Sequence, residues 1–140
     1  MSTSTPNQRK PIEFRLDLQS GVPVYRQIID QVMGRMAAGT LQPGDQLPTV
    51  RQVAVDLAIN PNTVQRAYRE MEIRGVLETQ QGTGTFISRQ QVKQSDVERR
   101  RQLSQLVSDF VARAGAAGFT TRELLEEIHA FNTEGERKRR

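Results

Sequence analysis

The fold of this sequence is constrained most strongly by residues 49–87. This region has the pattern of two short capped helices followed by two segments of strand length. Thr49 with Gln52 three residues later forms a capping-box pattern, which predicts that a helix starts there. Asn60 is a favourable N-cap, and Pro61 suits the first helical position because its missing N–H would have no partner. The order therefore predicts two helices that meet at a tight turn.

Apolar spacing shows which side of each helix is buried. The second helix carries apolar residues at i, i+3, i+4 and i+7, the spacing of a single buried face, namely Val64, Ala67, Tyr68 and Met71. The inward residues of the first helix are Val50, Val53, Ala54 and Leu57. A longer helix with the same kind of stripe is predicted from Pro23 to a stop at Gly39. A loop with inward anchors at Leu41 and Leu47 connects it to the capped pair.

Beyond Gly75 the pattern becomes extended. Residues 76–80 and 85–87 are of strand length and are separated by Gln81-Gly82-Thr83-Gly84, which predicts a β-hairpin. Three helices followed by a hairpin is the order of a winged helix-turn-helix, a DNA-reading fold. The predicted fold class is mainly α with a small β-hairpin: an N-terminal winged helix-turn-helix followed by a two-helix C-terminal dimerisation module. The predicted domains are an N-terminal arm (1–21), the DNA-binding domain (22–90) and a helical tail (91–140).

Burial of the apolar stripe leaves a polar face on the second capped helix. Its outward residues are types that read base edges or hold phosphates, namely Asn62, Thr63, Gln65, Arg66 and Arg69. The first turn of such a helix enters the major groove, and its short side chains are expected to leave helix N–H groups open to a phosphate. Arg51 is a candidate phosphate clamp, with a surface ion pair to Asp45 or Asp56 as the alternative.

The glycines of the hairpin loop raise the question of a nucleotide site. A dinucleotide fingerprint needs a third glycine and a following helix, and a P-loop needs a lysine, so neither pattern is met. The glycines instead make the hairpin tip slim enough to approach a groove, with Gln81, Gly82 and Thr83 as DNA-contacting candidates. An ordinary β-turn is the alternative.

The segments LPTVR, NPNTVQRAYREME and GTGTF occur in the order found in the GntR family of bacterial transcription regulators, which the chain resembles over about residues 22–89. The short helical tail is most similar to the YtrA-type subfamily. The resemblance implies that Arg51, Asn62, Thr63, Gln65 and the hairpin-tip residues Gln81 and Gly82 contact double-stranded DNA. Many members carry a basic residue where this chain has Pro61, and proline cannot make that contact. The resemblance therefore implies that Asn62, Thr63 and Gln65 make most of the DNA contacts at this turn.

Two further apolar stripes occur in the tail. The first comprises Leu103, Leu106, Val107, Phe110, Val111 and Ala114, and the second comprises Leu124, Leu125, Ile128 and Phe131. Between them, Thr120 and Glu123 form another capping box. Two helices alone cannot cover both stripes, so the tail is predicted to form a homodimer. Packing of the tail on its own DNA-binding domain is the alternative. A small-molecule effector of unknown identity is a further expected partner.

Catalytic and metal chemistry find little support in the sequence. The lone histidine, His129, has no nucleophile beside it, and its neighbours Glu123, Glu126 and Glu127 fit a solvated helix face better than a metal site. We therefore expect no enzyme activity, no cofactor and no metal. With no cysteine, no secretory signal and no membrane-length apolar run, a cytoplasmic location is expected.

Charge is permissive evidence for a nucleic-acid partner. The net charge is +4, and 17 of the 20 basic residues are arginine, the side chain suited to forked contacts with phosphate and guanine. A codon bias toward arginine would explain this equally well. The competing function is a winged-helix protein-interaction module without specific DNA binding. An RNA reader is disfavoured because no aromatic platform is exposed.

Overall fold

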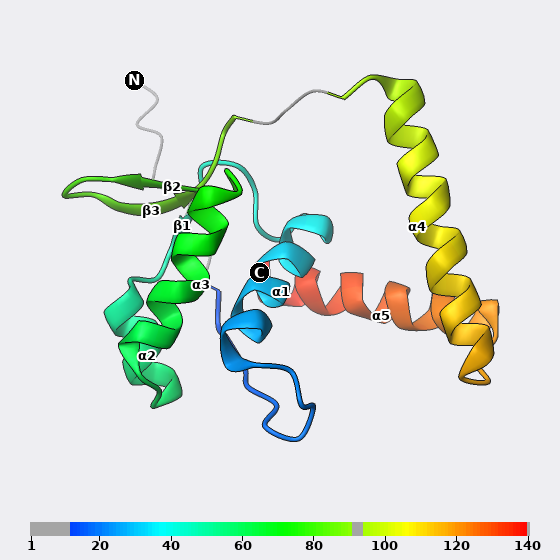
Figure 1. Cartoon of the computed structure of the whole chain (residues 1–140), viewed down its shortest axis with the longest axis horizontal. Helices are drawn as coiled ribbons and strands as arrows, with labels where there is room; N and C mark the ends of the chain where they lie inside the picture. The colour runs from blue at the N-terminus through cyan, green and yellow to red at the C-terminus, as the bar shows by residue number, and fades with distance from the viewer. Residues whose placement is uncertain (1–11, 91–93, 140) are drawn as a thin grey trace. The chain divides into compact units, whose positions relative to one another are not determined.

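The computed structural model describes residues 12–90 and 94–139 of the 140-residue chain, with side chains through residue 133. The chain forms two compact units that divide after Gln90 (Figure 1). Part of the arm predicted for residues 1–21 lies outside the described residues. No described helix is long and apolar enough to cross a membrane.

Three helices form the core of the N-terminal unit: α1 (Val24–Ala37), α2 (Val50–Leu57) and α3 (Pro61–Ile73). The predicted caps are present, since Thr49 Oγ1 accepts the Gln52 N–H at 3.1 Å and Asn60 Oδ1 accepts the Asn62 N–H at 2.8 Å. The predicted apolar faces meet in one cluster that includes Ile28, Ile29, Val32, Val53, Ala54, Val64, Ala67, Tyr68 and Met71. The three predicted helices are therefore confirmed.

The turn between α2 and α3 depends on one left-handed residue. Ala58 has φ of 54° and ψ of 47°, which reverses the chain directly after α2. The Ile59 N–H donates to the Ala54 carbonyl oxygen at 3.0 Å and so closes the end of α2. This geometry leaves room for the Asn60 cap to start α3 at once.

The sheet has one more strand than the sequence predicts. The predicted hairpin is present as β2 (Leu77–Gln80) and β3 (Gly84–Ile87), but β1 (Gln46–Leu47) pairs antiparallel with the other side of β3. The interpretation of residues 41–48 as loop alone was therefore wrong at these two positions. Leu41 and Leu47 are both buried, as predicted. The strand order β1-β3-β2 anchors the hairpin base to the chain just before α2.

An extended segment before α1 also belongs to the core, since Ile12 and Phe14 are buried in the main cluster. Two glutamine side chains of α1 hold this segment. Gln31 accepts the Arg15 N–H at 2.9 Å and donates to its carbonyl at 2.7 Å, and Gln27 does the same for Asp17 at 2.8 and 2.9 Å. The spacings are similar, because four helical residues rise about 6 Å and two extended residues rise about 6.6 Å.

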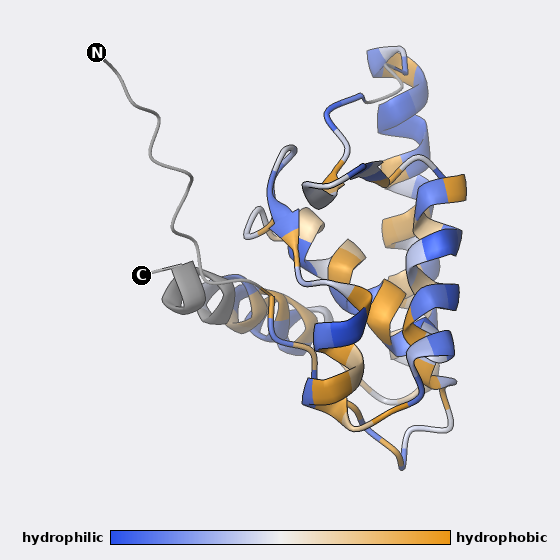
Figure 2. Ribbon diagram, turned by 90° about the vertical axis from the view of Figure 1, so that its left-hand side faces the viewer, coloured by the Kyte–Doolittle hydropathy of each residue, from blue (hydrophilic) through white to orange (hydrophobic). Residues whose placement is uncertain are grey.

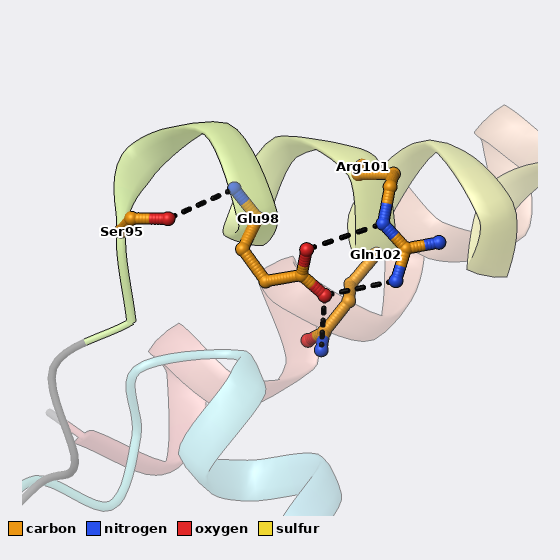
Figure 3. A network of polar contacts seen from close by, with 4 residues as sticks. All are labelled: Ser95, Glu98, Arg101 and Gln102. Carbon is orange, nitrogen blue, oxygen red and sulfur yellow. Dashed lines mark hydrogen bonds and ion pairs between the residues drawn. The ribbon is translucent and has the colours of Figure 1, made fainter.

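The second unit, residues 91–134, contains α4 (Asp96–Ala116) and most of α5 (Thr121–Arg139). Ser95 caps α4, and the Glu98 carboxylate accepts hydrogen bonds from Arg101 and Gln102 (Figure 3). The Arg101 bond holds the pKa of the Glu98 carboxyl below its ordinary value. The predicted capping box of α5 is confirmed in both directions between Thr120 and Glu123.

Candidate nucleic-acid interface

The outward face of α3 is the centre of the candidate interface. The stripe Val64, Ala67, Tyr68 and Met71 is at most 1% exposed, so the opposite side of the helix must face away from the core. The polar residues predicted there are accessible: Asn62, Gln65, Arg66 and Arg69 are exposed, and Thr63 is half-buried. The helix therefore presents amide, hydroxyl and guanidinium groups together, the types that read base edges and hold phosphates.

Tyr68 fixes the direction of this helix. Its ring is buried, and its hydroxyl donates to the carbonyl oxygen of Pro48, the residue before the N-cap of α2. Burial raises the pKa of the phenol above its ordinary value, in keeping with a neutral hydroxyl that donates this bond. One side chain thus ties the middle of α3 to the start of α2.

The start of α3 offers fewer free donors than expected. The Asn62 N–H donates to Asn60 Oδ1, and the Thr63 N–H donates to the Asn60 carbonyl oxygen at 3.0 Å. Pro61 has no N–H at all. The expectation that short side chains leave N–H groups open to a phosphate was therefore wrong for the first three positions. Contacts to a ligand at this turn must come from side chains.

Neighbouring elements lie beside the two edges of this polar face. On one side, Arg66 Cζ lies 3.8 Å from the centroid of the Tyr25 ring, which belongs to α1. On the other, the Thr79 hydroxyl of β2 donates to Glu72 at 2.6 Å. The recognition face, defined as Asn62, Thr63, Gln65, Arg66 and Arg69, is thus flanked by α1 and the hairpin. The Tyr25 contact joins two distant parts of the sequence, and sequence reasoning did not find it.

Arg51 lies in the first turn of α2 and is exposed. In the part of the chain that the structure describes, it forms no ion pair with either Asp45 or Asp56. The surface-pair alternative is therefore not met in this structure. Its charge is available to an anion.

We expect Arg51→Ala to weaken binding to all duplexes, because a phosphate clamp carries little sequence information. The negative slope of log affinity against log salt should become shallower by about one, as for the loss of one phosphate contact. Anisotropy titrations of a labelled duplex at several salt concentrations would measure both effects. Equal affinity and equal slope for the variant and the wild type would remove Arg51 from the interface.

The hairpin tip is exposed at all three candidate positions, Gln81, Gly82 and Thr83. Gly82 has φ of +77°, and the Thr83 N–H donates to the Gln80 carbonyl at 3.0 Å, so the tip is a closed turn. Gln46 of β1 supports it from the side, donating from Nε2 to the Thr83 carbonyl at 3.1 Å. Sequence reasoning missed Gln46 because its partner lies 37 residues away.

Gly84 is required by the same arrangement. It has φ of +135°, and a Cβ placed there would lie 2.5 Å from Gln46 Nε2. The second glycine of the loop thus allows the Gln46 side chain to reach the tip. The Gly-x-Gly pattern thus has a structural explanation that needs no nucleotide: Gly82 adopts the left-handed conformation of the turn, and Gly84 leaves space for Gln46.

His129 and its acidic neighbours, which were considered for catalysis or metal binding, belong to α5 and not to α3. His129 is an exposed residue of α5. Among the residues that the structure describes, no three His, Cys, Asp or Glu side chains gather as a metal site would require.

Comparison with known proteins gives a consistent assignment. Residues 24–87 match the family described as bacterial regulatory proteins, gntR family. The chain is 42% identical to the uncharacterised HTH-type transcriptional regulator YhcF of Bacillus subtilis, over 84% of this chain and 95% of that protein. It is 39% identical to the HTH-type transcriptional repressor YtrA of the same organism, over 84% and 92%. A solved structure of YtrA from Sulfolobus acidocaldarius, a GntR-family transcription factor, is 31% identical over 71% of this chain and 97% of that one, with a TM-score of 0.52.

Proposed function

We propose that this chain, which belongs to the GntR family of bacterial regulatory proteins and is a DNA-binding transcription regulator, acts as a dimeric repressor. The exposed polar face of α3, set over a fully buried apolar stripe, is the observation that carries the proposal. By covering a two-fold operator, the dimer would block access to a promoter.

The proposed division of labour follows the sequence. Residues 22–90 bind DNA and residues 91–140 join two copies. Asn62, Thr63 and Gln65 read bases from the first turns of α3, while Arg51, Arg66 and Arg69 contact phosphates. Gln81, Gly82 and Thr83 approach a neighbouring groove edge from the hairpin tip. These roles use exposed or half-buried positions.

Apolar side chains of the second unit support dimerisation. Ala114 is the only residue of α4 and α5 that is buried among those whose side chains are described. Large apolar residues remain open to solvent on both helices, namely Leu103, Leu106, Val107, Phe110, Leu125, Ile128 and Phe131. Orange bands accordingly recur along α5 in Figure 2. A patch of this kind marks an interface, and a second copy would cover it symmetrically.

We expect Leu106→Glu to convert the protein from dimer to monomer, because it places a charge in the proposed apolar contact. Leu106 is 67% exposed in the single chain, so its replacement should leave each unit folded. Sedimentation at micromolar concentration would report the change in mass. DNA affinity should fall in parallel, since two half-sites are no longer bound together.

Ser108→Glu provides the matched control. It adds the same charge to an exposed position of α4 outside the apolar stripe, and the dimer should persist. A wild-type chain that sediments as a monomer, with or without DNA, would contradict the dimerisation proposal.

Three finer points complete the proposal. A small-molecule effector would act by shifting the angle between the two recognition helices and so the affinity for a two-fold site. The protein has no enzymatic role, in keeping with relatives named as transcription regulators. Its proposed location is the cytoplasm, because the bacterial chromosome that it would bind lies there.

Selection of bound fragments from genomic DNA tests the function directly. Recovered sites should share a two-fold motif with half-sites separated by roughly 34 Å, about one turn of DNA. Affinity for them should decrease steeply as salt rises, because phosphates release counterions on binding. No enriched motif together with salt-insensitive binding would favour a winged-helix module that binds another protein.

A further inference from the structure

Arg66 is held against the body of the protein by an aromatic ring. Its guanidinium carbon lies 3.8 Å from the centroid of Tyr25, a half-buried residue near the start of α1. The Tyr25 side chain also packs on the edge of the main core. The ring is therefore a fixed support, while Arg66 itself stays exposed.

This contact leaves the arginine chemically available. A ring face attracts a cation through its quadrupole and takes up none of the five guanidinium N–H donors. Arg26 and Arg74, by contrast, each face a carboxylate, Asp30 at 3.4 Å and Glu70 at 3.6 Å. Within the described residues, Arg66 forms no ion pair. Its full charge and its donors remain free for an anionic ligand.

Arg66 lies one helical turn after Asn62 and Thr63, the residues proposed to read bases. Arg66 follows Asn62 by four residues and Thr63 by three, so all three share one side of the helix. Because Arg66 is stacked on α1, its guanidinium lies at the edge of the recognition face. A group at this edge is suited to the DNA backbone that borders the groove, where phosphate contacts fix register.

We propose that Tyr25 is a positioning residue that holds Arg66 in place to bind a phosphate of the DNA backbone. This inference rests on the proposed DNA-binding function. An unsupported arginine side chain loses rotamer entropy when it binds a phosphate. Because the Tyr25 ring already restricts Arg66 in the free protein, less entropy is lost on binding. Tyr25 thereby strengthens DNA binding without touching DNA.

Four variants test the inference by anisotropy, on a duplex recovered by selection and on its scrambled version. Arg66→Gln should weaken both complexes about tenfold and make the salt dependence of affinity shallower by about one unit of slope. Tyr25→Leu should weaken binding about two- to fivefold with an unchanged slope, since the charge remains. Tyr25→Phe keeps the ring and should bind as the wild type does. Tyr25→Leu added to Arg66→Gln should cause no further loss.

Arg74→Gln is the matched control, because it removes an arginine charge at the C-cap of the same helix, far from the recognition face. It should leave affinity within about twofold. The inference is overturned if Tyr25→Leu weakens binding as much in the Arg66→Gln protein as in the wild type. It is equally overturned if Arg66→Gln changes neither affinity nor slope. A wild-type protein that binds neither duplex in a salt-dependent way would instead remove the proposed function.

Discussion

Gln65→Ala is expected to reduce discrimination between a selected duplex and its scrambled version by about 1–3 kcal/mol, the contribution of one bidentate base contact. Gln65 is exposed on α3, so its amide is accessible to a base edge in the proposed groove. An amide can both donate to and accept from one base edge, which a methyl group cannot do. Binding to scrambled DNA should change little, because non-specific affinity comes from phosphates. The ratio of the two dissociation constants measures the effect.

Gln19→Ala is a suitable control for this substitution. Gln19 is an exposed glutamine in the turn before α1, so the same atoms are removed outside the recognition face. Its ratio of dissociation constants should equal that of the wild type. If Gln65→Ala leaves the ratio unchanged, or weakens both complexes equally, Gln65 does not read a base.

Met71→Ala is expected to lower the free energy of unfolding of the N-terminal unit by about 2–5 kcal/mol. Met71 is 0% exposed and belongs to the cluster beneath α3. Its removal would leave a cavity below the recognition helix and loosen the support of the whole polar face. Urea unfolding followed by circular dichroism would measure the loss.

Ile73→Ala on the same helix is the control for core packing. Ile73 is 78% exposed, so truncation there should change stability by less than about 0.5 kcal/mol. A similar loss for both variants would mean that Met71 stabilises the helix locally and does not support it through the core.

Local signals were strong enough to predict most of the fold. The caps at Thr49, Asn60 and Thr120 each satisfy a helix start through residues within three positions, so sequence alone reveals them. The stripe on α3 likewise follows from helical periodicity. The exposure of the recognition residues was inferred from that same stripe, and their contacts with DNA remain predictions.

Features that depend on distant partners were not predicted. Strand β1 has only two residues, and no alternating pattern can show in so short a run. It becomes a strand because β3 lies beside it. The stacking of Arg66 on Tyr25 depends in the same way on how α1 meets α3, which periodicity does not specify. The occupied N–H groups at the start of α3 were a missed consequence of a correctly predicted Asn60 cap.

The contacts of Gln27 and Gln31 with the segment before α1 determine where a DNA-binding fragment of this chain can begin. A fragment cut at residue 22 would lack Ile12 and Phe14 and leave the amides of Gln27 and Gln31 without their backbone partners. Its exposed core edge would invite aggregation. A shortened DNA-binding fragment should therefore keep the residues from Ile12 onward, well ahead of the region that matches the family.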